Sequence, residues 1–289
     1  MVLLLGVFAC SLSVIFLKTS QTHAYWLSAA RLLIAAAFLS PLMVIEARKL
    51  PGALSTQSLL LSVPGAVMLA VHFITWTIGA RMTTAANGTL MVNLTTVVMP
   101  IVMWLMNRER VNRGEIVGGI LAMSGVAALV GSQYELSPQG VRGDLICFGS
   151  MCLFCVYLAF SRRLGMGRSL WLYIVPLYAI SGLICALIAL VTRAPFPTLT
   201  PRETTLLLCL GLVPTVIGHT VMNWCMKTMR GPVVSTANLF QFAFSGVTAY
   251  ILFRELPAAS FYPVCGLIIA GSVIVILSHR SSVDVDVES

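Results

Sequence analysis

The chain has 289 residues and a net charge of +8, and 58% of its residues are hydrophobic while only 10% are charged. A soluble domain of this composition would expose far more apolar surface than water tolerates, so we exclude that class. Nucleic acid is not an expected partner either, because the basic residues lie at the ends of apolar segments, where they set orientation in a bilayer. The composition predicts an integral membrane protein.

Apolar segments of about 20 residues, long enough to span a bilayer as a helix, follow one another along the chain. We expect ten of them, at approximately residues 2–17, 25–45, 58–79, 85–106, 116–131, 144–160, 170–191, 204–226, 232–253 and 260–278. The polar, turn-forming stretch nearest the middle separates two halves. The predicted organisation is a first five-helix unit at 1–133, a linker at 134–143, a second five-helix unit at 144–279 and a cytoplasmic tail at 280–289.

Residues 72–109 and 219–255 are two versions of one pattern. Each version begins with a histidine (His72, His219), passes a basic residue near a short turn, continues into a long apolar run and ends in Arg-Glu. An internal duplication predicts two structural units. Because five segments is an odd number, the second unit must enter the membrane from the opposite side. The expected fold class is an all-α polytopic membrane protein with ten transmembrane helices as two inverted five-helix repeats.

The distribution of Lys and Arg predicts the orientation of the chain. With the N-terminus in the cytoplasm, seven of the 18 basic residues fall outside and eleven fall inside: Arg48, Lys49, Arg108, Arg110, Arg113, Arg162, Arg163, Arg168, Lys227, Arg230 and Arg280. We therefore expect a multi-pass protein of the cell inner membrane with both termini in the cytoplasm.

Acidic side chains are absent from the middle of the predicted helices; Glu46, Glu109, Glu115, Asp144 and Glu255 all fall at helix ends. This removes the usual proton carrier and the usual partner of a cationic drug, and it leaves no acid-base pair or metal-ligand set for an enzyme. The eight cysteines lie within apolar segments, where packing is their expected role. No nucleotide-binding motif is present. We expect no enzymatic activity, no cofactor and no metal.

Neutral polar and aromatic side chains gather on single helix faces in both halves. His72 and Trp76 are four residues apart, as are His219 and Asn223, while Asn238 and Gln241 are three apart. Such faces line a polar-aromatic cavity or hydrogen-bond neighbouring helices, and both readings stay open for any single residue. The two histidines either carry protons or serve as hydrogen-bond partners. The full set of candidate substrate-binding residues is His72, Trp76, Asn93, His219, Asn223, Trp224, Asn238, Gln241 and Arg31.

Arg31 and the regularly spaced small residues each have two possible roles. Arg31 either extends to the headgroups or attracts an anionic group of a solute. Small residues recur at Gly114, Gly118 and Ala122, and again at Gly266 and Ala270, which allows close helix contact within a monomer or at the seam of a homodimer. We therefore expect a monomer or a homodimer whose partners are a small-molecule substrate and the lipid bilayer.

Several local motifs stand out in both halves: the His72-Phe73 to Trp76 face, Thr84-Ala85-Ala86, Pro100, Arg108-Glu109 and Gly118-Gly119 in the first half, then Asn223-Trp224, Gly231-Pro232, Arg254-Glu255 and Gly266, together with Arg31. These motifs resemble those of the EamA-type transporters of the drug/metabolite transporter superfamily. The resemblance implies ten helices in two inverted repeats, a substrate cavity between the halves, and movement of small metabolites across the inner membrane, often outward. The four-helix multidrug relatives use a first-helix carboxylate that this chain lacks.

Our hypothesis is a secondary transporter of amino acids or similar small metabolites, acting as an exporter by alternating access. Two alternatives remain at this point. One is a passive channel or facilitator, and the other is an exchanger similar to the sugar-phosphate and nucleotide-sugar transporters.

Overall fold

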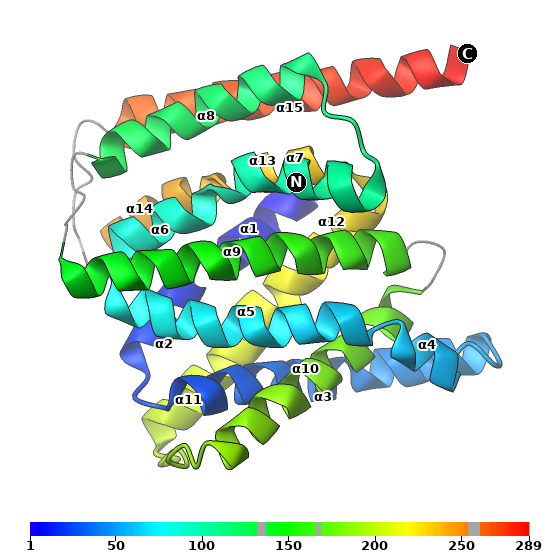
Figure 1. Cartoon of the computed structure of the whole chain (residues 1–289), viewed down its shortest axis with the longest axis vertical. Coiled ribbons are helices and arrows are strands. Elements are labelled where there is room, and N and C mark those ends of the chain that lie inside the picture. Colours follow the sequence, from blue (N-terminus) through cyan, green and yellow to red (C-terminus); the bar gives the residue numbers. More distant parts are fainter. Residues whose placement is uncertain (132–136, 166–168, 254–260, 289) are drawn as a thin grey trace.

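The structure is a computed structural model that describes residues 1–131, 137–165, 169–253 and 261–288. Within these ranges it does not describe the side chains of residues 85, 86, 89, 126, 128–131, 245, 246, 249, 250, 252, 253, 261 and 279–288. The regular elements of the described part are all helical (Figure 1).

The helices in chain order are α1 (Val2–Ser11), α2 (Ser13–Thr19), α3 (Ala24–Lys49), α4 (Thr56–Leu60), α5 (Val63–Met82), α6 (Ala85–Asn93), α7 (Thr95–Asn107), α8 (Arg113–Gly131), α9 (Pro138–Gly165), α10 (Leu170–Val191), α11 (Pro201–Leu210), the π-helix η1 (Gly211–His219), α12 (Thr220–Thr228), α13 (Gly231–Ala237), α14 (Phe240–Phe253) and α15 (Phe261–Glu288). Seven described stretches are long and apolar enough to cross a membrane: Val2–Thr19, Ala24–Lys49, Thr56–Met82, Leu90–Asn107, Pro138–Gly165, Leu170–Val191 and Pro201–Thr228. Tyr262–Ser278 is a shorter apolar helix. The described part of the chain is thus all-helical, and the protein is a multi-pass membrane protein.

Three long helix pairs form the framework of the bundle: α5 with α9, α8 with α15, and α3 with α10 (Figure 1). Each pair joins a helix from the first half of the chain to one from the second. A Cβ placed on Gly118 of α8 would lie 2.5 Å from the carbonyl oxygen of Gly271 on α15. The small-residue face predicted on residues 114–122 therefore packs within the chain, because only glycine lets these two backbones approach so closely.

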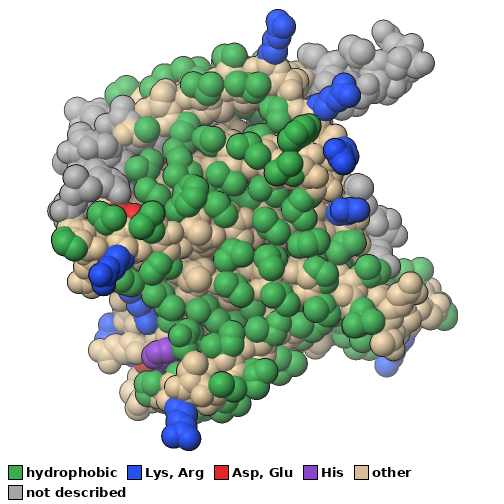
Figure 2. Space-filling model, in the orientation of Figure 1, with side chains coloured by type: hydrophobic (Ala, Val, Ile, Leu, Met, Phe, Trp, Pro, Cys, Tyr) green, Lys and Arg blue, Asp and Glu red, His purple; other side chains and the backbone are tan. Residues whose placement is uncertain are grey.

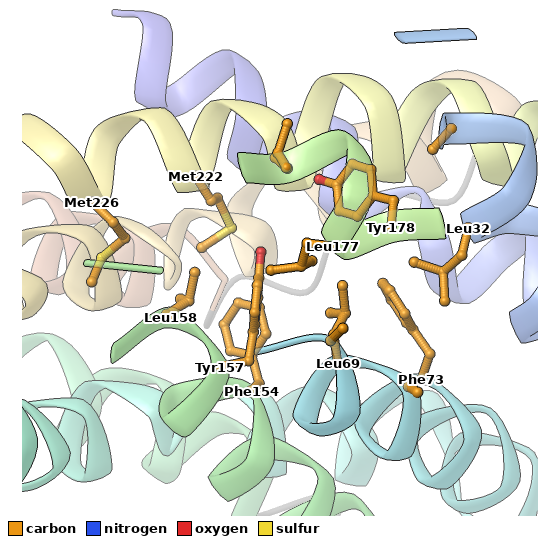
Figure 3. Close-up of a cluster of buried hydrophobic side chains, with 14 of the residues drawn as sticks. Leu32, Leu69, Phe73, Phe154, Tyr157, Leu158, Leu177, Tyr178, Met222 and Met226 are labelled. Atoms are coloured by element: carbon orange, nitrogen blue, oxygen red, sulfur yellow. The ribbon is translucent and has the colours of Figure 1, made fainter. Parts of the chain in front are cut away.

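A continuous cluster of buried side chains fills the centre of the bundle (Figure 3). Its labelled members come from α3, α5, α9, α10 and α12, and they include the rings of Phe73, Phe154, Tyr157 and Tyr178. Large hydrophobic side chains cover much of the outer face as well, whereas the Lys and Arg side chains lie around its edges (Figure 2). This is the surface expected of a protein that faces hydrocarbon along its middle and headgroups at its ends.

Several membrane segments are irregular: α1 and α2 meet at Leu12, α6 and α7 meet at Leu94, and η1 separates α11 from α12. The clearest case is η1, which has Pro214 near its middle. Proline has no N–H to offer the carbonyl four residues earlier, that of Leu210. The hydroxyl of Thr215 donates to this carbonyl oxygen at 2.9 Å, so the freed acceptor is satisfied inside the apolar segment. The resulting π-helix ends at His219 and is followed directly by α12.

One sequence expectation is wrong. Asp144 was placed at the end of its segment, but α9 begins at Pro138, since proline suits the first turn of a helix. Asp144 consequently lies almost two turns inside α9, is only 3% exposed, and accepts hydrogen bonds from Thr83 Oγ1 (2.6 Å) and Asn87 Nδ2 (3.2 Å). The predicted motif at Arg254-Glu255 and part of the predicted linker lie outside the described residues.

Candidate functional site

A cavity with about 560 Å³ of empty space, counted together with its open side, lies at the centre of the bundle. Both halves of the chain contribute to its wall, from α1, α2, α5, α6, α7, α9, η1, α12, α14 and the break between α13 and α14. The lining residues are Cys10, Ser13, Val14, His72, Phe73, Trp76, Val92, Thr95, Met151, Phe154, Pro214, His219, Met222, Asn238 and Gln241. These side chains are aromatic, apolar or neutral and polar.

Five of the nine residues predicted from the sequence lie together in this wall: His72, Trp76, His219, Asn238 and Gln241. They come from three parts of the chain and meet only because α5, η1 and the beginning of α14 converge on the cavity. The other four, Asn93, Asn223, Trp224 and Arg31, are not among the lining side chains.

The two histidines stand close to each other, with ring centroids 6.4 Å apart. His72 Nδ1 lies 2.8 Å from the carbonyl oxygen of Ser150 on α9. Because a carbonyl oxygen can only accept, this contact places the proton on Nδ1 and leaves Nε2 as an acceptor. His219 is held by rings, with the centroids of Phe73 at 4.9 Å and Phe154 at 5.7 Å. The imidazoles are therefore oriented by α9 and by aromatic packing.

Asn238 and Gln241 form an amide pair in the wall. α13 ends at Ala237 and α14 begins at Phe240, so Asn238 stands in the short break between the helices. Gln241 Nε2 donates to Asn238 Oδ1 at 2.6 Å. This bond fixes the orientation of both amides and leaves Asn238 Nδ2 and Gln241 Oε1 as the donor and acceptor that the pair can present to a solute.

Asn223 lies one turn of α12 beyond His219 and behind the wall. Its Nδ2 donates to the carbonyl oxygen of His219 at 2.7 Å and also to the hydroxyl of Tyr157 on α9. The bond to Tyr157 ties the second histidine helix to α9. Our sequence analysis missed Tyr157, although a phenolic hydroxyl inside an apolar segment is itself a signal, since it needs a partner there.

Asn93 and Trp224 occupy other places. Asn93 is buried, and neither atom of its side-chain amide has a hydrogen-bond partner among the described residues. Trp224 is 44% exposed on the outer surface of α12. Consecutive helical residues point about 100° apart, so a helix that turns Asn223 inward must turn Trp224 toward the surroundings.

Arg31 on α3 is only 1% exposed, so it does not extend to the headgroups. Its Nε donates to Thr215 Oγ1 at 3.0 Å and its Nη1 to Ser13 Oγ at 3.4 Å. The centre of the guanidinium lies 3.9 Å from the centroid of the Phe73 ring. Ser13 and Phe73 both line the cavity, so Arg31 stands directly behind its wall.

A cluster of ion pairs lies at one end of the bundle. Glu109, after α7, is 3.0 Å from Arg162 Nε on α9 and 3.2 Å from Arg230 Nε before α13. Arg230 also lies 3.2 Å from Glu115 of α8. Arg162 donates in addition to the carbonyl oxygens of Met226 (2.8 Å) and Met229 (2.6 Å). We call Glu109, Glu115, Arg162 and Arg230 the ion-pair cluster. In the sequence, only Arg108-Glu109 at the end of the first repeated pattern pointed to this part of the chain.

Comparison with known proteins gives one family match. Residues 1–131 match the model of the EamA-like transporter family, whereas a comparison with curated proteins gives no match. A solved structure described only as "Crystal structure of protein" is similar over 97% of this chain and 96% of its own, with a TM-score of 0.79 and 16% sequence identity. At that identity the likeness shows a shared fold alone. The first 131 residues thus support a likeness to the EamA-type transporters, and the solved structure shares the fold of nearly the whole chain.

Proposed function

We propose that this protein is a secondary transporter that carries a small polar or aromatic metabolite, such as an amino acid, outward across the inner membrane by alternating access. The observation that carries this proposal is the central cavity, lined from both halves of the chain by aromatic rings, two imidazoles and an amide pair.

The packing of the helices supports ten spans in two inverted repeats. The first repeat would be α1–α2, α3, α5, α6–α7 and α8, and the second α9, α10, α11–α12, α13–α14 and α15. A twofold relation between them pairs α3 with α10 and α8 with α15, and both pairs are present. The same relation requires that the contact of α5 with α9 has a counterpart between α1 and the segment formed by α11, η1 and α12. This counterpart is present, because α1 packs on η1.

A closed barrier on one side of the cavity supports alternating access. Phe154 lines the cavity on α9, and Arg162 of the ion-pair cluster follows eight residues later, which is about 12 Å along a helix. Tyr157, Leu158 and Met226 fill the space between these levels (Figure 3). A carrier must close one side while the other is open, and this arrangement supplies a closed side with contacts from both halves.

The charge distribution supports the predicted orientation. Arg108, Arg162 and Arg163 lie together around a pocket at the end of α7 and α9. The positive-inside tendency favours a cytoplasmic position for this end, with the barrier on the inner side and both termini inside. The lack of an acidic side chain among the described cavity-lining residues favours neutral or anionic solutes over cationic drugs.

Counterflow in proteoliposomes tests the proposal. Vesicles loaded with one of a panel of unlabelled amino acids, sugars or nucleotide sugars receive a trace of the labelled solute, with and without a pH gradient. Transient accumulation of the label driven by one solute class is the expected result and defines the substrate class. Simple equilibration without counterflow would indicate a channel and contradict the carrier, while activity confined to nucleotide sugars or sugar phosphates would replace the amino-acid class.

A further inference from the structure

Arg31 is a buried cation without an acidic partner among the described residues. Its guanidinium engages two hydroxyls, those of Thr215 and Ser13, and one aromatic face, that of Phe73. Nη2 is buried and has no hydrogen-bond partner among the residues that the structure describes. Glu109 and Glu115, which pair with Arg162 and Arg230, lie at the end of the bundle. The charge of Arg31 is therefore uncompensated by any carboxylate described.

A packing role alone does not explain this charge. A guanidinium stays protonated and has five N–H donors and no acceptor, and a cation kept in a membrane interior without a counter-ion is costly. A neutral side chain could hydrogen-bond the same two hydroxyls without that cost. The described lining of the neighbouring cavity contains no acidic side chain either, so the net fixed charge at the cavity is positive.

An anion would approach Arg31 from its cavity side. Two of the groups that touch the guanidinium, Ser13 Oγ and the Phe73 ring, also line the cavity. Phe73 packs in turn against the imidazoles of His72, with centroids 5.1 Å apart, and His219. A rotation of the Phe73 ring would therefore join the guanidinium to the space between the two histidines.

We infer that Arg31 is the counter-ion of a carboxylate on the transported solute, and that Phe73 covers it when the site is empty. This inference rests on the proposed function, which it narrows to aromatic or apolar solutes with one carboxylate. One guanidinium offers the two parallel N–H groups that a carboxylate accepts. A phosphate dianion would call for a second cation, and the described cavity lining supplies none.

Four solutes that share one phenyl-propyl skeleton separate the groups involved: phenylalanine, phenylalaninamide, 3-phenylpropionate and 3-phenylpropionamide. Each is tested as a competitor of labelled phenylalanine in counterflow and as a stabiliser of the purified wild-type protein in thermal unfolding. We expect both carboxylates to compete and to stabilise, with or without the amino group. We expect each amide to bind at least about tenfold more weakly, as the loss of one charged hydrogen-bonding pair predicts.

Variants then assign the effect to Arg31. Arg31→Gln is expected to lose the preference for carboxylates over amides while keeping its weak binding of 3-phenylpropionamide, and Arg31→Lys should keep part of the preference. Arg202→Gln, at an exposed position of α11, is the matched control and should behave like the wild type. If Arg31→Gln does not fold, the comparison rests on Arg31→Lys and on the wild-type competition series.

The outcomes distinguish this inference from the proposed function. Counterflow in which the wild-type protein accepts the acids and amides equally would overturn the role of Arg31 and leave the transporter intact. A carboxylate preference that survives in Arg31→Gln would also overturn it. Counterflow of other solute classes only would overturn both the inference and the proposed substrate class.

Discussion

Replacing Glu109 by Gln should open the closed side of the cavity more often. Glu109 carries two ion pairs, to Arg162 and to Arg230, and its side chain is only 10% exposed. Gln keeps the shape and an oxygen acceptor for the N–H of Gly231, which lies 3.2 Å from Glu109 Oε1. Arg162 retains the carbonyl oxygens of α12, so the change removes mainly the charge pairing.

Hydrogen bonds to charged groups contribute about 1.5–3 kcal/mol each, whereas exposed ion pairs contribute about 0–1 kcal/mol. For two partly buried pairs that share one carboxylate, we take a total loss of about 2–3 kcal/mol. If the ion-pair cluster exists only when this side is closed, the same free energy shifts the equilibrium toward the open state. Since about 1.4 kcal/mol is tenfold, the shift is roughly 30- to 140-fold.

Cys10 reports this shift, because it is a free thiol in the cavity wall. A membrane-impermeant thiol reagent is added to vesicles that expose the inner face, and labelling is compared with a matched chain carrying Cys10→Ser. We expect the Cys10-dependent labelling rate to rise in Glu109→Gln. Glu46→Gln is the control, since Glu46 forms no ion pair with any described residue. An unchanged rate in Glu109→Gln, with unchanged transport, would refute the barrier role.

Three other predictions follow from the packing. Trp76→Ala combined with Asn223→Ala should abolish transport without preventing membrane insertion, because Trp76 lines the cavity and Asn223 positions His219. Unchanged transport rates in proteoliposomes would contradict the assignment of this cavity as the substrate site. Gly118→Leu should lower the melting temperature of the purified protein by several degrees, because the leucine side chain would collide with the backbone of α15 at Gly271. An unaltered melting curve would contradict this close contact. Glu203→Gln should lower the free energy of unfolding by about 1.5–3 kcal/mol in denaturant unfolding, because Glu203 accepts three hydrogen bonds from residues 20–22. A loss no larger than that of a substitution at an exposed position would contradict this role.

The sequence alone supports much of the fold and some of the site. Hydrophobic composition and segment length indicate a multi-pass helical protein, and the family match over residues 1–131 agrees with the motifs from which the resemblance was drawn. The spacing of four between His72 and Trp76 correctly predicts a shared face, because helical periodicity is local. The ten-span count, the domain division and the roles of the site residues remain predictions.

Local periodicity could not separate the wall of the cavity from the layer behind it. Asn223 and Trp224 follow one another in the sequence, yet the first is buried and the second is exposed, since the rotation of α12 is fixed by its contacts with α9. Tyr157 becomes part of the site only because it meets Asn223 across 66 residues of sequence. Such contacts depend on which helices are neighbours.

The charged residues show the same division. Arg31, Glu109 and Arg230 were visible in the sequence as charges at or near the ends of apolar segments, and composition determined that each would need a partner or water. Tertiary structure alone decided that Glu109 pairs with Arg162 and Arg230, whereas Arg31 stands behind Phe73 without a carboxylate among the described residues. Hydropathy is a property of single segments, but burial and charge compensation are properties of the packed helices together.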